Sequence, residues 1–149
     1  MSASEALSEF QERFRLDELT VCERGEWVVS VRPGQITLGS MVVSSAAGVL
    51  TFESLDREAQ ADLGETFGMV ERLAKSCFGA VRVNIVCLMM KDPVIHFHVL
   101  PRFDRVVEYS GRSWEDLDWP GPPTFGPAPT DDDVLLAVCE TLRTESRSL

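Results

Sequence analysis

Alternating apolar and polar residues predict five β-strands along this chain. Runs rich in β-branched and aromatic residues with a period of two are typical of strands that have one face buried. Strands are therefore expected at residues 19–23, 27–31, 37–45, 81–90 and 94–102. The first two are separated by Arg24-Gly25-Glu26, where glycine favours a hairpin turn, and Pro33-Gly34 ends the second strand.

A period close to 3.6 residues predicts helices in three other segments. Residues 4–14 place Leu7, Phe10 and Phe14 on one helical face. The longest helix is expected from an N-cap at Asp56 to about residue 77. A last helix is expected from about residue 130 to 143, with Asp133 in the glutamate position of a capping box at its start. Its apolar face comprises Val134, Leu135, Val138 and Leu142.

Five strands and one long helix predict an α+β domain with a mainly antiparallel sheet. A length of 149 residues suits a single domain over 1–149, with a core at about 16–103 and an extension at 104–149. Five of the eight prolines lie between Pro120 and Pro129, so this extension contains an irregular arm. The arm is interpreted either as a belt packed over the domain or as a wall of the functional site or a dimer contact.

The composition excludes several classes of protein. An apolar fraction of 44% and a charged fraction of 26% are ordinary for a globular domain. The sequence contains no run of about 20 apolar residues, so no membrane-spanning helix is predicted. The polar N-terminal segment has no apolar stretch typical of a secretory signal, so a cytoplasmic protein is expected. Four cysteines without a Cys-x-x-Cys pair predict reduced, mostly buried thiols.

The net charge of −10 argues against nucleic acid as a partner, because binding along its backbone usually requires a basic stripe. The segment 91–105 is less acidic than the whole chain and carries Lys91, Arg102 and Arg105. A small phosphate ligand is compatible with that local charge, since donors in contact with a ligand outweigh the net charge of the protein.

The chain has only two histidines, His96 and His98, and they lie two residues apart in an expected strand. Residues i and i+2 of a strand share one face, so both imidazoles are expected side by side. The spacing allows three interpretations: a structural pair, a metal site completed by a carboxylate such as Asp92 or Asp104, or a catalytic pair.

The residues around the histidines resemble a known signature. The run His96-Phe-His-Val-Leu-Pro-Arg102 resembles the end of the motif of the histidine triad superfamily of nucleotide hydrolases and transferases, in which three histidines alternate with apolar residues. The resemblance extends upstream over residues 32–43, 55–56 and 83–93 and covers about 16–103. The Trp- and Pro-rich segment 114–123 resembles an extension of some bacterial members.

The resemblance assigns His96 as the nucleophile and His98 as the contact to phosphate or to the leaving-group oxygen. The first histidine of the triad falls on Val94, so this chain has a dyad. A further histidine of some members falls near Leu38. One hypothesis is that Leu38 and Val94 lie close together and replace a hydrogen-bonded pair with an apolar pair.

The resemblance implies a nucleotide hydrolase or nucleotidyl transferase that forms a nucleotidyl-histidine intermediate at the α-phosphate. Implied substrates are nucleoside phosphoramidates, as for a phosphoramidase, dinucleoside polyphosphates and nucleotide sugars. No cofactor is required, although Mg²⁺ suits polyphosphate substrates, and a homodimer is expected. A nucleotide-binding module without catalysis is the alternative. The residues expected to bind the nucleotide are Trp27, Ser30, Leu38 and Arg102.

Overall fold

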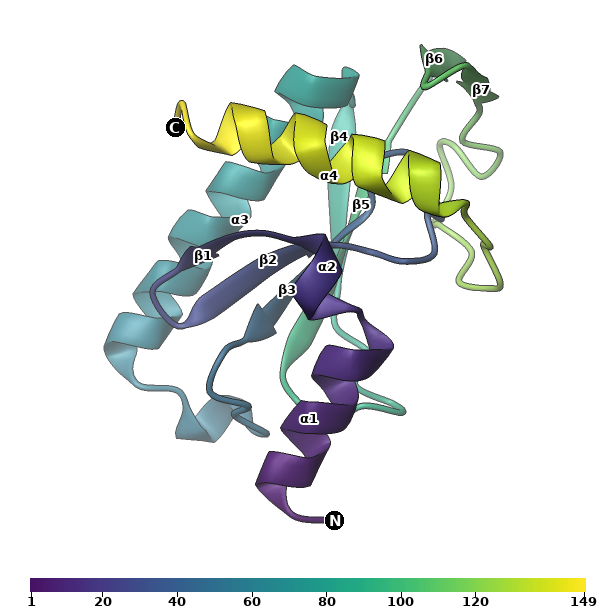
Figure 1. Ribbon diagram of the computed structural model, residues 1–149. Helices are drawn as coiled ribbons and strands as arrows, with labels where there is room; N and C mark the ends of the chain where they lie inside the picture. The colour runs from purple at the N-terminus through teal and green to yellow at the C-terminus, as the bar shows by residue number, and fades with distance from the viewer.

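Five antiparallel strands form the main sheet, in the order β1-β2-β3-β5-β4 (Figure 1). The computed structural model describes residues 1–149. The strands are β1 (Thr20–Arg24), β2 (Trp27–Val31), β3 (Met41–Ser45), β4 (Arg82–Val86) and β5 (His96–Arg102). Because β5 pairs with β3 on one side and β4 on the other, both histidines are held on an interior strand.

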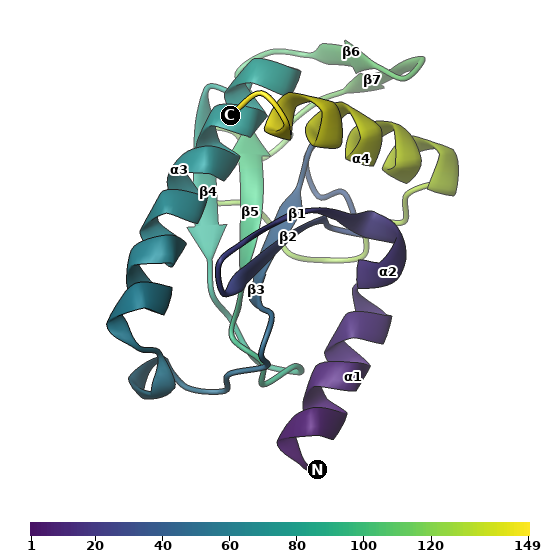
Figure 2. The same ribbon diagram turned by 60° about the vertical axis from the view of Figure 1, so that its left-hand side comes forward.

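The two faces of the sheet are covered differently. Alternate residues of the strands, including Val29, Val43 and Val99, share the main core with residues of α3 (Arg57–Phe78) and α4 (Asp132–Ser146). On the opposite face, Phe10 of α1 (Ala3–Arg13) packs with Val42 and Val94 in a smaller cluster. Figures 1 and 2 show α1 standing away from α3 and α4. The histidines belong to the α1 face, because Phe97 between them points into the main core.

The long helix forms as its capping residues predict. The Ala59 N–H donates to the carboxylate of Asp56 over 2.8 Å, which satisfies one free donor of the first turn. Gly79 ends α3 with a φ of 74°, a conformation that costs glycine little. The α+β class, the antiparallel sheet and this helix are confirmed.

Three expected strands are shorter than their apolar runs, and one of them, expected at 94–102, begins at His96. The strand expected at 37–45 begins only at Met41, because the Gln35 side chain satisfies the preceding backbone. Its amide donates to the carbonyls of Arg32 and Ser40, and its oxygen accepts from the Gly39 N–H. The strand expected at 81–90 ends at Val86, and residues 87–95 form a loop that leads into β5.

Several local features were not predicted. They are α2 (Leu16–Leu19), a 3₁₀ turn η1 (Phe52–Ser54) and the hairpin of β6 (Val107–Tyr109) and β7 (Arg112–Trp114). The prediction of a capping box for the last helix is wrong. Helix α4 begins after Asp131 without a side-chain cap, and the Thr130 hydroxyl accepts a hydrogen bond from the Gln35 N–H instead.

The cysteines and the helices bear on two other expectations. All four cysteines are free, but only Cys139 is buried: Cys22 in β1 and Cys77 in α3 are partly buried, and Cys87, in the loop after β4, is exposed. None of the helices combines the length and the apolar character needed to cross a membrane.

Candidate functional site

A hollow of about 570 Å³ lies beside the two histidines. The end of α1, the loop after β2, the loop before β5 and the C-terminal arm all contribute to its wall. The lining residues are Arg13, Phe14, Arg32, Leu88, Met89, Met90, Lys91, Asp92, His96, His98, Phe125, Gly126 and Pro127. The volume lies in the range of small-molecule sites.

His96 is held in one tautomer by the backbone of its own strand. Its Nδ1 lies 2.7 Å from the carbonyl oxygen of Val94. A carbonyl only accepts, so Nδ1 carries the proton and Nε2 keeps its lone pair. Val94 therefore orients His96 through its carbonyl, while its side chain packs against Phe10.

His98 is held in the opposite tautomer. The Nε of Arg32 lies 3.2 Å from His98 Nδ1, and because a guanidinium only donates, Nδ1 must be the acceptor. Neutral His98 therefore carries its proton on Nε2. Burial, followed by the positive charge of Arg32 and by His96, lowers the pKa of His98 to about 4. At neutral pH His98 is thus an uncharged N–H donor.

Aromatic rings enclose both imidazoles. The ring of Phe10 lies 5.0 Å from that of His96, and the ring of Phe14 lies 5.6 Å from it. Phe125 of the arm meets the His98 ring edge-on at 5.4 Å. Because of this cover, His96 is only 3% exposed and His98 only 6% exposed.

The hollow carries positive charge in an acidic protein. Arg13, Arg32 and Lys91 line it, against a single carboxylate, that of Asp92. Asp92 is already paired with Arg13 at 3.3 Å. Neither Lys91 nor Arg32 is paired with a carboxylate, so their charges can attract an anion, and burial lowers the pKa of Arg32.

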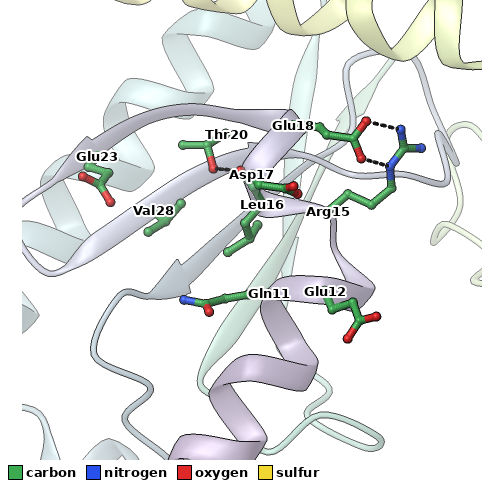
Figure 3. Close-up of a pocket in the computed structure, with 9 residues that line it drawn as sticks. All are labelled: Gln11, Glu12, Arg15, Leu16, Asp17, Glu18, Thr20, Glu23 and Val28. Atoms are coloured by element: carbon green, nitrogen blue, oxygen red, sulfur yellow. Dashed lines mark hydrogen bonds and ion pairs between the residues drawn. The ribbon is translucent and has the colours of Figure 1, made fainter.

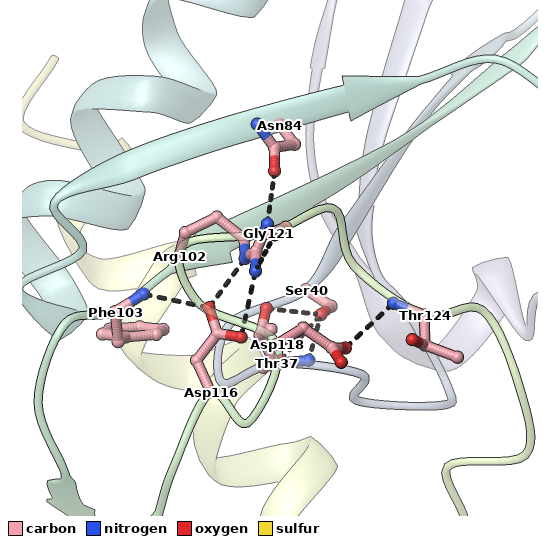
Figure 4. A network of polar contacts seen from close by, with 9 residues as sticks. All are labelled: Thr37, Ser40, Asn84, Arg102, Phe103, Asp116, Asp118, Gly121 and Thr124. Carbon is pink, nitrogen blue, oxygen red and sulfur yellow. Dashed lines mark hydrogen bonds and ion pairs between the residues drawn. The ribbon is translucent and has the colours of Figure 1, made fainter.

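The Pro-rich arm is anchored to the end of β5 by Arg102 (Figure 4). The guanidinium donates to both carboxylate oxygens of Asp116, to Asn84 Oδ1 and to the Gly121 carbonyl, with N···O distances from 2.7 to 3.1 Å. It also lies 5.8 Å from the Trp119 ring. The two interpretations of the arm both hold in part, because it packs as a belt here and then supplies Phe125 to the wall of the hollow.

All four residues expected to bind a nucleotide lie outside the hollow. Trp27 and Leu38 belong to the main core on the other face, where Trp27 Nε1 donates to the Ala59 carbonyl. Arg102 is 2% exposed and its donors are used by the arm. Ser30 lies on the histidine face but is fully buried, and its hydroxyl has no hydrogen-bond partner. Of the expected site residues, only His96 and His98 line the hollow.

The hypothesis that Leu38 and Val94 replace a hydrogen-bonded pair is wrong. Leu38 packs in the main core and Val94 in the cluster under α1. The strand register also separates them, because Leu38 precedes the Met41–Val99 pair and Val94 precedes the pair formed by His96. The two positions therefore lie at opposite ends of the sheet and on opposite faces.

The metal interpretation finds no supporting donor set. No group of three or more histidine, cysteine, aspartate or glutamate side chains is gathered around the histidines or elsewhere. Asp92 is paired with Arg13, and Asp104 is paired with its neighbour Arg105 on the surface.

A second hollow of similar size, about 590 Å³, lies beside α2 (Figure 3). Its wall contains four carboxylates and one cation, Arg15. Arg15 is already paired with Glu18 and Asp132, each at 3.0 Å. This hollow therefore repels an anion, and it contains no histidine, so the histidine hollow is the better candidate site.

Arg32, Phe14 and Phe125 are site residues that the sequence did not single out. Arg32 stands in the segment 32–43 that carries the resemblance, but its reach to His98 depends on the turn at Pro33-Gly34. Phe125 lies 27 residues after His98 in an irregular arm, so no periodicity points to it.

The fold is that of histidine triad (HIT) proteins. A HIT protein from Sinorhizobium meliloti 1021 superposes with a TM-score of 0.69 at 21% identity, over 89% of this chain and 93% of that one. A histidine triad protein from Marinobacter aquaeolei VT8 also has a TM-score of 0.69, at 19% identity over 93% and 95% of the two chains. A Zn-bound histidine triad family protein from Mycobacterium smegmatis gives 0.61 at 16% identity, over 97% and 99%. No protein-family profile matches the sequence, and no curated protein does.

Proposed function

We propose that this protein binds a nucleotide in the histidine hollow and transfers the nucleotidyl group to His96, as a hydrolase or nucleotidyl transferase acting at the α-phosphate. The observation that carries the proposal is the hydrogen bond from His96 Nδ1 to the Val94 carbonyl. It leaves Nε2 unprotonated, which is the form of imidazole that attacks phosphorus.

The proposed reaction has two steps. The Nε2 lone pair attacks the α-phosphorus, the bond to the leaving group breaks, and the leaving group takes the bonding pair. Water, or another acceptor in a transferase, then attacks the same phosphorus, and the P–N bond pair returns to His96 as the attacking oxygen loses its proton to solvent. The Nε2–H of His98 and the cations Arg32 and Lys91 are suited to stabilising the phosphoryl oxygens.

His96→Ala is expected to abolish turnover, because His98, the other imidazole in the hollow, has its one ring lone pair occupied by Arg32. A panel of adenosine and guanosine phosphoramidates, dinucleoside tri- and tetraphosphates and nucleotide sugars, with and without Mg²⁺, supplies the substrates. Intact-mass analysis should detect a nucleotidyl adduct on the wild type after a rapid quench.

His96→Asn is the matched control for folding, since its amide can still donate toward the Val94 carbonyl while lacking the nucleophile. Both variants should melt near the wild-type temperature and be inactive. A fully active His96→Ala protein would refute the assignment of His96.

A nucleotide-binding module without turnover is the second candidate. The observation in its favour is the cover of Phe10 and Phe14, under which His96 is 3% exposed. Calorimetric binding of a nucleotide by both the wild type and His96→Asn, without adduct or turnover, would favour this candidate. A homodimer stays a prediction, for which β1 and β4 are the edge strands of the sheet.

A further inference from the structure

Arg32 makes the only side-chain hydrogen bond to either histidine. It follows β2 directly, and its side chain crosses to β5, where Nε meets His98 Nδ1 at 3.2 Å. The same guanidinium donates through Nη1 to the Gly34 carbonyl at 2.6 Å. These two hydrogen bonds fix the orientation of the Arg32 guanidinium relative to the His98 imidazole.

The contact is sheltered by the C-terminal arm. The Phe125 ring lies 5.9 Å from the Arg32 guanidinium and 5.4 Å from the His98 ring, so it packs over both groups. A hydrogen bond to a cation is stronger where water is excluded. The arm thus protects the contact that orients His98.

We infer that Arg32 is a positioning residue that holds His98 as a neutral Nε2–H donor and so completes a site that lacks one histidine. The inference deepens the proposed function and rests on it for its catalytic meaning. Nδ1 of His98 already accepts a hydrogen bond from the Arg32 cation. Protonation of Nδ1 would break that bond and place two positive charges, those of Arg32 and of the imidazolium, side by side.

The other charged groups around the hollow do not account for this state of His98. Lys91 would oppose protonation of His98 without contacting it, and Asp92 would favour protonation but is paired with Arg13. His96 is the neighbour on the same strand, with its ring 5.1 Å away, and its proton is committed to the Val94 carbonyl. Only Arg32 selects which ring nitrogen of His98 is protonated.

The experiment reads the tautomers directly and needs no substrate. With ¹⁵N-labelled histidine, long-range ¹H–¹⁵N spectra of the wild type should show opposite patterns for the only two imidazoles of the chain. His96 should carry its proton on Nδ1 and His98 on Nε2, with His96→Asn used to assign the signals.

In Arg32→Met, His98 should lose the fixed Nε2–H pattern, and its titration should move toward the ordinary histidine range. His96 should keep its pattern, which makes it an internal control. Arg72→Met removes an exposed arginine from α3 and should change neither ring. Arg32→Lys keeps the positive charge but not the Nε–H, so it separates charge from orientation.

An Nδ1–H pattern for His98 in the wild type would overturn the inference, as would an Arg32→Met protein whose His98 spectrum and titration match the wild type. These outcomes do not depend on turnover. If the tautomers are as expected and no substrate of the panel reacts, the proposed function fails while the role of Arg32 stands.

Discussion

The two histidines differ in which ring nitrogen carries the proton, and that difference separates their chemistry. His96 presents a lone pair because its proton is committed to the Val94 carbonyl. His98 presents a proton because its lone pair is committed to Arg32. A valine at position 94 is compatible with this division, because a backbone carbonyl needs no particular side chain there.

The state of His98 has a consequence for the leaving group. Giving up the Nε2 proton would leave an imidazolate, so His98 is suited to donating a hydrogen bond and not to general acid catalysis. A phosphate or polyphosphate departs as a stable anion, whereas an amine departs readily only after gaining a proton.

The protein is therefore expected to hydrolyse a dinucleoside polyphosphate with a higher kcat/KM than a phosphoramidate of the same nucleoside. The expected ratio is about 100-fold, the lower range of what general acid catalysis contributes. Steady-state kinetics on the two substrates measure it. A higher kcat/KM for the phosphoramidate would show that another group protonates the amine.

At the scale of elements, helix α1 is the cover of the histidine face. Its apolar side is narrow, and Phe10 is its one large residue that is completely buried, among Ala6, Val42 and Val94. The same ring lies 5.0 Å from the His96 ring, so the packing of α1 and the accessibility of His96 are linked.

Phe10→Ala is expected to lower the free energy of unfolding by about 3 kcal/mol, the lower range for a buried phenylalanine. It should also raise the rate at which diethylpyrocarbonate modifies His96, because the ring that covers the imidazole is gone. Urea denaturation and peptide mass mapping measure the two effects.

Phe52→Ala is the matched control, since Phe52 is 54% exposed and lies in η1 away from the histidines. It should cost less stability and leave the modification rate of His96 unchanged. An unaltered rate in Phe10→Ala would show that α1 does not control access to His96.

At the scale of the whole molecule, Arg102 joins the end of β5 to the C-terminal arm. The pair with Asp116 is buried, with side chains 2% and 3% exposed. Burial acts to raise the pKa of Asp116, but the hydrogen bonds from Arg102 and the Phe103 N–H and the charge of Arg102 outweigh it and lower that pKa. Asp116 therefore contributes stability above about pH 4, which is lost as the pH falls through its lowered pKa.

Arg102→Met is expected to destabilise the protein by about 3–5 kcal/mol at pH 7, because the carboxylate of Asp116 is left buried without its cation. It should also loosen the arm, so that hydrogen exchange at Phe125 becomes faster. Denaturant unfolding and hydrogen exchange measure these changes.

Arg105→Met is the control, because the pair of Arg105 with Asp104 is about half exposed and such pairs contribute about 0–1 kcal/mol. If Arg102→Met and Arg105→Met had the same free energy of unfolding, the anchoring role of Arg102 would be contradicted.

The α+β class, the antiparallel sheet, the long helix and the placement of His96 and His98 on one face follow from the amino-acid sequence alone. These features depend on local periodicity and capping, which act between residues a few positions apart. The Asp56 cap and the Gly79 stop, for example, each need only neighbours in the chain.

The surroundings of the histidines, in contrast, depend on how distant segments of the chain pack together. Arg32 meets His98 across 66 positions of the chain, and Phe125 returns to the same imidazole through an arm fixed by Arg102. Conversely, Trp27 and Leu38 were expected at the site but belong to the main core, because the side of the sheet that each faces depends on how the strands and helices pack. Such contacts are set by register and packing between distant segments, and local sequence patterns do not encode them.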